Sequence, residues 1–502
     1  MERTQPASVK YVETTDTVRL KQISLGLIHL PVENLLSQSL RIEMMITKRI
    51  LATFFSCFLI PVSFSLLAQN QRADGYKSLW AKSGPPLEYG YKYSGGMGTF
   101  SSQHKPLAIY SPESKKTFFV FSGTSDPAES HLQIMVSYFD HKTKKVPRPV
   151  IVYDKMGVND PQDNATISID SKGYIWIFIS GRARTRPGLI FKSALPYSID
   201  SFDRVFEGEL VFPQPWWMND SCFMLMHTKV TRGRELYWTS SADGLTWQPD
   251  KKLAGMGGHH QITNVSGNKL ASAFSYFPEG NLDKRTNIYF VQTEDYGKTW
   301  KTADNKILDT PITDIHTEAL VKDYESESKL VYLKDLNFDS EGNPVILALI
   351  TRDYRPGPAG NPREWFVIRW HDNEWNFFKV CESSHNYDMG SLYIEANDWR
   401  IIAPTMQGPQ KDRTGGEIEI WTSFDEGITW AMSRQLTSGS TWNYSYVRRP
   451  VNAQKEFYAF WTDGNPDQIS ESHIYFTNKA CDKVYVLPYT MKKDFEKPAR
   501  LK

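Results

Sequence analysis

Short apolar runs separated by tight polar turns dominate the chain after about residue 100. In the stretch 104–140, polar residues separate the runs HKPLAIY, TFFVFSG and LQIMVSYFD, and the last run ends in an aspartate. β-Branched and aromatic residues bounded by Gly, Asn, Asp and Ser are typical of strands joined by hairpin turns. Helical periodicity is almost absent, although the segment 314–327 has the spacing of a short helix. The pattern therefore predicts a chain built almost wholly from β-strands.

The same unit of three apolar strands and an Asp-rich turn recurs seven times. Its first strands begin, at spacings of 45 to 69 residues, near positions 104, 165, 215, 260, 329, 390 and 444. This spacing is close to that of four-stranded propeller blades, which bury their faces by stacking around an axis. We predict an all-β fold: a seven-bladed β-propeller of four-stranded antiparallel blades, as one domain over residues 75–490. A β-sandwich or two separate β domains is the alternative, but the repeat runs on without a linker.

Three of the turns resemble the Asp-box motif: SADGLTW (241–247), TEDYGKTW (293–300) and SFDEGITW (423–430). An aspartate at this place in a turn accepts hydrogen bonds from backbone N–H groups, and glycine supplies a positive φ. We expect the tryptophan that ends each motif to pack between blades. The motif is thus predicted to hold the scaffold, and its acids are poor candidates for catalysis. The residues concerned are Asp243, Asp295, Asp425, Gly244, Gly297, Gly427, Trp247, Trp300 and Trp430.

The N-terminal region has the layout of a secretory signal peptide. Thr47-Lys48-Arg49 precedes an apolar run, residues 50–68, that ends in small residues. Because signal peptides lie at the start of a chain, we interpret 1–43 as an upstream over-read and 44–68 as the signal peptide. The mature chain would be secreted or periplasmic after cleavage near Ala68, with no membrane insertion. Pro61 inside the run argues against a membrane anchor, and the mid-run position of Cys57 argues against a lipoprotein.

Charge and cysteine content narrow the function further. The chain has 58 Lys and Arg against 57 Asp and Glu, so there is no overall charge that would favour nucleic acid. Aromatic residues make up 13% of the chain, a composition that suits sheets and sugar-facing surfaces. The three cysteines after the signal peptide are far apart in sequence and lack the spacing of metal ligands or of a disulfide framework.

Propeller geometry brings two kinds of loop to one face, namely the starts of inner strands and the loops between second and third strands. His104 and His260 stand at inner-strand starts, and loops of the second kind carry Arg184, Arg234 and Arg352. Arginines gathered on one face suit a carboxylate ligand, because guanidinium pairs with it bidentately. Each arginine alone could equally be a solvated loop residue, and each histidine a structural one. The pair at 259–260 could also ligate a metal with Asp388 or His385, but the spacing matches no known metal motif, so any metal ligands stay unassigned.

The Asp-box turns and two segments, NATISIDSKGYIWIFISGR (164–182) and VYLKDLNFDSEGNPVILALITRD (331–353), resemble BNR-repeat proteins of Bacteroides-like bacteria. The resemblance covers the mature chain and is greatest to the propellers of glycoside hydrolase family 145, later treated as polysaccharide lyase family 42. It implies removal of terminal L-rhamnose linked α-1,4 to D-glucuronate on arabinogalactan-protein glycans, either as a lyase or as an α-L-rhamnosidase. It implies no cofactor for the chemistry, and a structural Ca²⁺ with ligands that the sequence does not identify.

The residues favour elimination over hydrolysis. Glycoside hydrolysis normally uses two carboxylates, and no inward acid pair is evident, whereas elimination needs a base and a group that neutralises the uronate. By resemblance the catalytic histidine starts the first blade, which assigns His104, with Arg184, Arg234, Arg352 and His260 holding the substrate. Neighbouring strand residues face opposite ways, so Gln103 would replace His104 if it faced the site, and the protein would then be a weak or inactive member.

Two other functions stay open at this stage. A sialidase also combines Asp-boxes, a propeller and arginines that bind a carboxylate, but the sequence lacks the expected arginine motif at the start and an evident nucleophile pair. A carbohydrate-binding propeller without catalysis could use exposed aromatic residues such as Trp216 and Trp217.

Overall fold

The structure is a computed structural model that describes residues 69–124, 131–158, 160–183, 185–396 and 398–501. The predicted upstream segment 1–43 and signal peptide 44–68, together with Arg184, lie outside the described residues. In the described part, no helix has the length and apolar character needed to cross a membrane.

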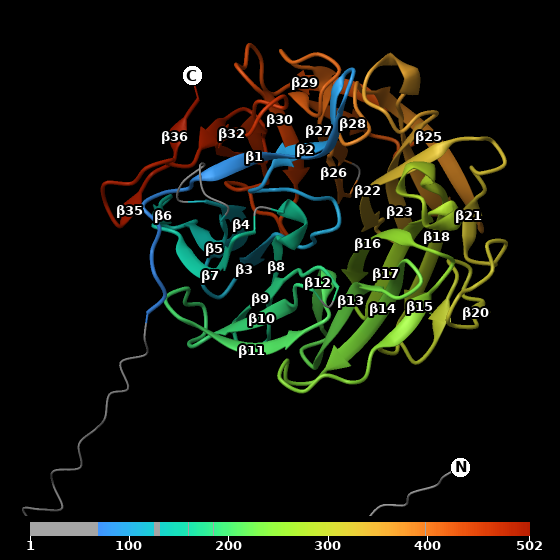
Figure 1. Cartoon of the computed structure of the whole chain (residues 1–502), viewed down its shortest axis with the longest axis horizontal. Helices are drawn as coiled ribbons and strands as arrows, with labels where there is room; N and C mark the ends of the chain where they lie inside the picture. Colours follow the sequence, from blue (N-terminus) through green and yellow to red (C-terminus); the bar gives the residue numbers. More distant parts are fainter. Residues whose placement is uncertain (1–68, 125–130, 159, 184, 397, 502) are drawn as a thin grey trace, which may run out of the picture. The chain divides into compact units, whose positions relative to one another are not determined.

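The described chain is all-β and its sheets are antiparallel, which confirms the all-β part of the prediction (Figure 1). The described helical elements are 3-10 turns: η2 (Pro161–Asp163), η3 (Pro278–Gly280), η4 (Leu282–Lys284) and η5 (Pro358–Gly360). The short helix predicted over 314–327 is wrong. Within that segment β21 (Leu320–Lys322) pairs with β18 (Thr286–Thr293), so sheet pairing overrides the local helical pattern.

The first four repeats and their sheets correspond in order. The first repeat forms β3 (Ala108–Ser111), β4 (Lys116–Gly123), β5 (His131–Asp140) and β7 (Val150–Met156). The second forms β8 (Ala165–Ile169), β9 (Ile175–Ile179), β10 (Gly188–Ser193) and β11 (Phe202–Gly208). The third forms β12 (Val211–Met218), β13 (Cys222–Val230), β14 (Arg234–Ser241) and β15 (Lys251–Ala254). The fourth forms β16 (His259–Ser266), β17 (Lys269–Tyr276), β18, β19 (Trp300–Lys301) and β20 (Ile307–Leu308).

The last three repeats continue the pattern. The fifth forms β22 (Leu330–Phe338), β23 (Pro344–Thr351), β24 (Glu364–His371) and β25 (Glu374–Glu382). The sixth forms β26 (Ser391–Glu395), β27 (Asp398–Gln407), β28 (Gly416–Ser423) and β29 (Ala431–Gln435). The seventh forms β30 (Asn443–Arg448), β31 (Ala459–Gly464), β33 (Ile474–Thr477), β34 (Val484–Val486) and β36 (Ala499–Arg500), and one pairing, Gly416 with Tyr444, joins it to the sixth.

Two short pieces complete the sheets. An N-terminal hairpin of β1 (Ser78–Leu87) and β2 (Gly90–Gly96) precedes the first repeat, and β1 pairs with β32 (Ser470–Ser472). Near the C-terminus, β35 (Phe495–Glu496) pairs with β6 (Val146–Pro147). Both pieces therefore tie the first and last parts of the chain together.

Apolar side chains fill the spaces between consecutive sheets. One cluster combines the first two sheets with residues of the last, and others join the second to the third and the third to the fourth. In Figure 1 the sheets follow one another around the molecule in chain order. The first and last repeats also meet directly, because Val451 donates to the Ala108 carbonyl (2.8 Å) and Tyr110 donates to the Val451 carbonyl (3.0 Å).

The three Asp-rich turns form the hydrogen bonds that their sequence predicts. Asp295 accepts from the backbone N–H of Thr299 at 2.9 Å and from its hydroxyl at 2.6 Å, and Asp243 and Asp425 make equivalent backbone contacts. The turn glycines have φ values of 72° to 87°. Trp300 packs against Trp238 of the preceding sheet. These turns lie at the outer strands and serve the scaffold.

Candidate active site

A cavity of about 220 Å³ lies where the edges of six repeats and the N-terminal hairpin converge. Its walls come from the loop before β3, the turn η2, the loop after β9, the start of β14, β16 and the loop before β18, the segment before β26, and β30. Several of the loops predicted to share one face therefore meet, although the loop with Arg352 does not line the cavity. The lining residues are Ser83, Gly84, Tyr93, Phe100, Ser101, Ser102, Gln103, Gln162, Arg182, Phe212, Arg234, His260, Phe277, Leu282, Arg285, Tyr387 and Tyr446.

Arg285 is the most enclosed cation of the cavity. Its side chain is 4% exposed, and its guanidinium carbon lies 4.8 Å from the ring centre of Tyr332 and 5.7 Å from that of Tyr387. One terminal nitrogen donates to the Tyr387 hydroxyl at 3.3 Å, while Nε has no hydrogen-bond partner. Among the described residues, no carboxylate lies within ion-pair distance of Arg285. A buried guanidinium held only by aromatic rings is prepared for an anionic ligand.

Arg234 and Arg182 form a second cationic group of the cavity. Both donate to the side-chain carbonyl of Gln162, at 3.3 Å and 2.5 Å. Arg182 also pairs with Asp160 at 3.1 Å, whereas Arg234 stacks on Phe212. Burial, and then the charge of Arg182, lower the pKa of Arg234. Arg234 stays charged, because an arginine is protonated throughout the range in which proteins fold.

His260 presents a neutral imidazole to the cavity. Its Nε2 lies 3.2 Å from the Ser102 hydroxyl, and its Nδ1 is buried without a partner. Burial lowers the pKa of His260 well below its usual value, and the charges of Arg285 and Arg234 lower it further. A neutral imidazole in the wall of a cavity is a candidate proton acceptor.

Three tyrosines add hydroxyl groups to the same wall. Burial alone raises the pKa of Tyr93, but the charges of Arg285 and Lys92 outweigh it and leave the pKa lowered. Burial raises the pKa of Tyr387 and of Tyr446, and the Tyr446 hydroxyl is buried without a partner. The cavity thus holds both a tyrosine that ionises more easily than usual and tyrosines that keep their protons.

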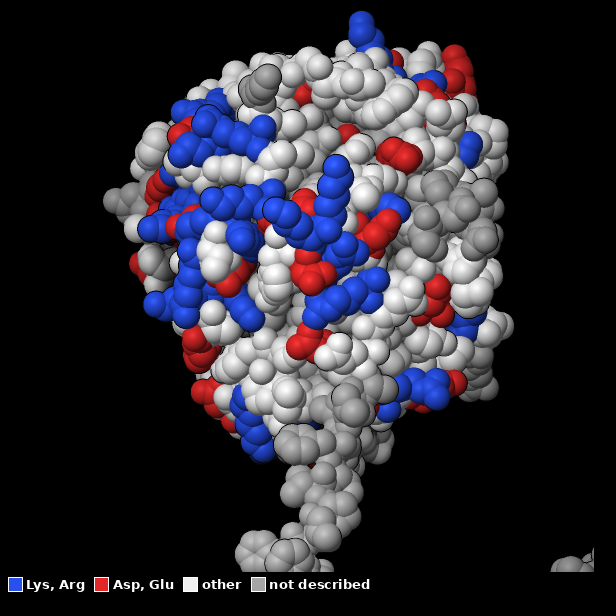
Figure 2. All heavy atoms as spheres, turned by 90° about the vertical axis from the view of Figure 1, so that its left-hand side faces the viewer, with Lys and Arg blue, Asp and Glu red and all other residues white. Residues whose placement is uncertain are grey.

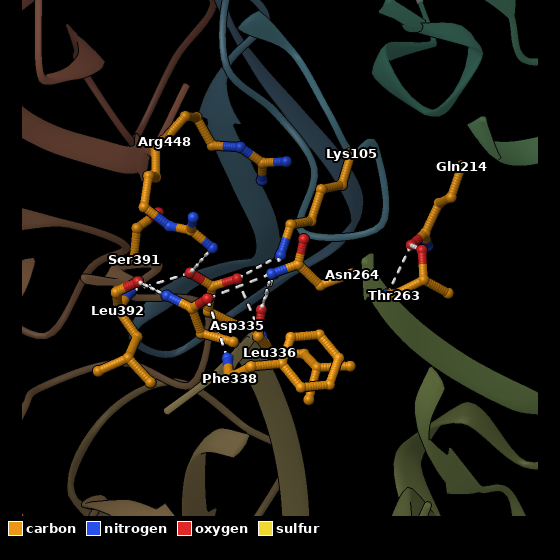
Figure 3. Close-up of polar contacts among 12 residues, drawn as sticks. Lys105, Gln214, Thr263, Asn264, Asp335, Leu336, Phe338, Ser391, Leu392 and Arg448 are labelled. Atoms are coloured by element: carbon orange, nitrogen blue, oxygen red, sulfur yellow. Dashed lines mark hydrogen bonds and ion pairs between the residues drawn. The ribbon is translucent and has the colours of Figure 1, made fainter. Parts of the chain in front are cut away.

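A cluster of polar side chains next to the cavity holds the loop that carries Ser102 and Gln103. Arg448 donates to the Ser101 carbonyl at 2.9 Å and to the His104 carbonyl. Lys105 pairs with Asp335, which also accepts from the backbone N–H of Leu392 at 2.9 Å (Figure 3). These contacts fix the loop from beneath, and so fix the Ser102 hydroxyl that meets His260.

Only some of the residues that the sequence predicts for the site line the cavity. Arg234 and His260 line the cavity, whereas Arg352 is exposed and absent from its walls. His104 is fully buried behind the lining, with Nδ1 3.1 Å from the backbone nitrogen of Ser101, and its neighbour Gln103 faces the cavity instead. Burial, and then the charge of Arg448, lower the pKa of His104 to about 3.

From the sequence, Arg285 is one of the loop arginines on the predicted site face, but it is not assigned a role, and none of the three tyrosines is predicted there. Arg285 stands in a loop of the expected kind, between the second and third strands of its repeat, so its position was a usable signal. Tyr93 belongs to the hairpin before the first repeat, Tyr387 precedes β26 and Tyr446 lies inside β30. No local pattern distinguishes these tyrosines from the many others in the chain.

A family model described as "BNR repeat-containing family member" matches residues 129–382, half of the chain. The chain belongs to this BNR repeat-containing family. A curated relative, "Ulvan lyase" of Nonlabens ulvanivorans, is 22% identical to this BNR-repeat protein over 157 residues. These residues make up 31% of the BNR-repeat protein and 32% of the relative. The matched region thus spans about a third of the curated relative's length.

Solved structures share the fold of this BNR-repeat protein over most of its length. A polysaccharide lyase family 25 ulvan lyase superposes with a TM-score of 0.65 at 14% identity, over 82% of this chain and 96% of that one. The polysaccharide lyase Uly1 gives a TM-score of 0.56 at 11% identity, over 82% and 98% of the two chains. Family 25 ulvan lyase has also been solved bound to -[GlcA(1-4)Rha3S]-. The narrower resemblance to glycoside hydrolase family 145 is not among these matches and stays a prediction.

Carboxylates are absent from the described walls of the cavity, since no Asp or Glu is among its lining residues. In the described part of the chain, no three His, Cys, Asp or Glu side chains gather in a way that could hold a metal ion. The Ca²⁺ suggested by the resemblance therefore stays a prediction without identified ligands.

Proposed function

We propose that this BNR-repeat protein is a polysaccharide lyase that cleaves a glycan at O4 of a uronate by β-elimination. The observation that carries this proposal is that Arg234 and Arg285 both line a cavity whose described walls hold no acid. Neither arginine has a carboxylate partner among the described residues. Two cations without a counter-charge favour a bound carboxylate, and the missing acid pair disfavours the usual machinery of hydrolysis.

In this mechanism the arginines bind the uronate carboxylate. They neutralise its charge and stabilise the negative charge that develops when the proton on C5 is removed. The electron pair of the C5–H bond then forms a C4=C5 double bond, and the bond from C4 to the glycosidic oxygen breaks. The products are an unsaturated uronate and the released sugar with a hydroxyl group.

His260 is our candidate for the base that accepts the C5 proton. Its ring is neutral and its Nδ1 has no partner. Because Arg285 and Arg234 help to depress its pKa, a substrate carboxylate between them would offset those charges and raise the pKa during binding. Tyr446, whose hydroxyl is buried without a partner and whose pKa is raised by burial, is our candidate for the acid that protonates the leaving oxygen.

The substrate we propose contains L-rhamnose linked α-1,4 to D-glucuronate. The resemblance to family 145 glycoside hydrolases favours a terminal rhamnose on arabinogalactan glycans. The ulvan lyase bound to -[GlcA(1-4)Rha3S]- supports the same pair of sugars in a different polysaccharide. The cavity volume of about 220 Å³ is below the roughly 300–1,000 Å³ of pockets for drug-sized ligands, so we expect it to enclose a short part of the glycan.

The architecture we propose is a closed seven-bladed propeller, and the protein is secreted or periplasmic. Seven repeats that form successive antiparallel sheets support this architecture, as do the backbone contacts of Val451 with the first repeat. Six repeats contribute to one cavity, as expected if their inner edges surround an axis.

Incubating the protein separately with gum arabic and with ulvan, and following absorbance near 235 nm, tests the reaction. The proposal predicts that absorbance rises with one of these substrates and that the His260→Ala variant loses the rise. Free rhamnose without absorbance would mean hydrolysis and would overturn the lyase assignment. Binding without any product would instead indicate a carbohydrate-binding protein, the alternative that the sequence ties to Gln103 lining the site in place of His104.

A further inference from the structure

We infer that a groove on the outer edge of the last sheet is a second, non-catalytic binding site for an anionic polysaccharide chain. The groove consists of two adjoining hollows. An apolar hollow of about 460 Å³ lies between the end of β5 in the first sheet and strands β33 and β34 of the last sheet, and a polar hollow of about 340 Å³ lies beside it. Lys483 lines both, and neither shares a residue with the catalytic cavity.

Positive charge is concentrated in this outer groove. Five lysines and one glutamate line the apolar hollow, and the polar hollow adds two arginines and one aspartate. The whole chain has a net charge of only +1, so the excess is local. Figure 2 shows Lys and Arg gathered on the side of the molecule that includes β6, β35 and β36. The basic residues of the groove are Lys144, Lys455, Lys479, Lys483, Lys497, Arg434 and Arg500.

Some of these cations already have a carboxylate partner, and others do not: Lys144 and Lys455 pair with Glu456, and Lys479 pairs with Glu395. Glu456 is already occupied, because it pairs with Lys144 at 2.8 Å and with His141 at 3.1 Å. Among the described residues, Lys483, Lys497 and Arg500 have no carboxylate within ion-pair distance. Unpaired cations in a groove attract a polyanion more strongly than cations that already have partners on the protein.

Aromatic rings form the floor of the apolar hollow. Phe476 stacks on Tyr485 with ring centres 5.1 Å apart and lies 5.4 Å from Phe139. Tyr485 is the half-buried member and presents part of its ring to the hollow. A ring flanked by lysines suits a sugar, whose apolar face stacks on the ring while its acidic groups meet the cations.

The occupant we assign is a uronate- or sulfate-bearing polysaccharide, and this choice rests on the proposed function. Two hollows in series suit a polymer better than a single sugar. A polymer held at the outer groove would keep further uronates near the catalytic cavity, which raises their effective concentration there. Nucleic acid is the competing occupant, but proteins that bind it usually carry a general basic excess, which this chain lacks.

The test reverses two groove charges and measures binding to immobilised ulvan on a His260→Ala background, so that no turnover interferes. We expect the Lys483→Glu/Lys497→Glu pair to weaken binding at least tenfold. A matched pair, Lys172→Glu/Lys298→Glu, changes two exposed lysines of other sheets that line neither hollow, and should change binding less than twofold. Uncharged dextran should not bind either form.

A second measurement uses the protein with His260 intact. For an ulvan tetrasaccharide, the groove pair should keep kcat/KM within twofold, while kcat/KM for the polymer falls. The inference is overturned if the groove pair changes polymer binding less than twofold, if the control pair weakens it equally, or if double-stranded DNA binds as tightly as ulvan. Groove-dependent binding without lyase activity would contradict the proposed function alone, and activity without groove-dependent binding would contradict this inference alone.

Discussion

His260 and His104 differ in what their rings contact, and this difference sets their expected roles. His260 lines the cavity and has a buried Nδ1 without a partner, whereas His104 is enclosed behind the lining and packs edge-on against Phe212. We expect His260→Ala to lower kcat by roughly 10²–10⁴-fold, the usual worth of a positioned base, while the melting temperature changes little. Initial rates at 235 nm and thermal unfolding curves measure both quantities.

Chemical rescue separates the loss of a base from a general disturbance. Added imidazole should restore part of the rate to His260→Ala. His104→Ala should instead act mainly through stability, because it leaves a cavity in a packed region. A normal rate for His260→Ala, or rescue of His104→Ala by imidazole, would move the base to a different residue.

Arg285→Lys tests whether the planar guanidinium matters or only its charge. Lysine keeps the charge but loses the fork geometry and the stacking between Tyr332 and Tyr387. We expect kcat/KM to fall about 10²-fold, comparable with the loss of one donor to a developing oxyanion. Arg352→Lys is the matched control, since Arg352 is exposed and outside the cavity, and should leave kcat/KM unchanged. Equal effects of the two variants would contradict the assigned role of Arg285.

At the scale of elements, the Asp-rich turns should affect stability and not catalysis. Asp295→Ala removes the bonds to the Thr299 backbone and hydroxyl. Burial alone would raise the pKa of Asp295, but its hydrogen bonds, chiefly those to Thr299, outweigh burial and leave the pKa lowered. We expect a loss of about 1–2 kcal/mol in the free energy of unfolding, with kcat unchanged. Urea unfolding of the variant, beside its rate at 235 nm, checks this. A lower kcat with an unchanged free energy of unfolding would instead indicate that Asp295 takes part in catalysis.

The elements show what local sequence can predict. Strands and turns followed from alternation and turn residues, because each hairpin is specified within a few residues. The prediction of a helix at 314–327 was wrong because Ile288 pairs with Lys322, a contact between distant residues that no local sequence pattern predicts. The site was predictable only in part. Arg234 and His260 stand at positions that the repeat marks. Tyr93 instead reaches the cavity from the N-terminal hairpin, which is outside the repeat, and strand β1 of that hairpin pairs with β32 near the C-terminus.

At the scale of the whole molecule, the contact between the first and last sheets should control unfolding. Phe457 stacks on Phe119 of the first sheet and on Phe476 of the last, with ring centres 5.6 Å and 4.6 Å apart. We expect Phe457→Ala to cost about 3–5 kcal/mol and to lower the urea midpoint for the entire chain. Phe424→Ala, at a site 78% exposed, is the control and should change stability by less than about 0.5 kcal/mol. A midpoint unaffected by Phe457→Ala would argue against closure through this contact.

Buried histidines should make the molecule sensitive to acid. Burial lowers the pKa of His104 to about 3 and of His259 to about 4, and it lowers the pKa of His260 and of His385 well below the usual value. Histidines in the unfolded chain titrate near pH 6.5, so below that pH they bind protons that the same histidines do not bind in the folded chain. Stability should therefore fall as pH drops from 6.5 toward 4, by about 1.4 kcal/mol per pH unit for each such histidine.

One group opposes this trend and sharpens its test. Burial raises the pKa of Asp388 to about 6, so between about pH 6 and 4 the folded chain binds this proton more readily than the unfolded chain does. Asp463, 3.4 Å from His473, raises the pKa of His473, but that contribution is complete below pH 6.5 and does not change the slope there. Four histidines against this one carboxyl group leave a net loss of stability in acid. Calorimetric melting temperatures from pH 8 to pH 4.5 should fall continuously below pH 6.5, and His385→Gln should fall less steeply than the parent. A flat profile from pH 7 to pH 5 would mean that the histidines are protonated in the folded molecule.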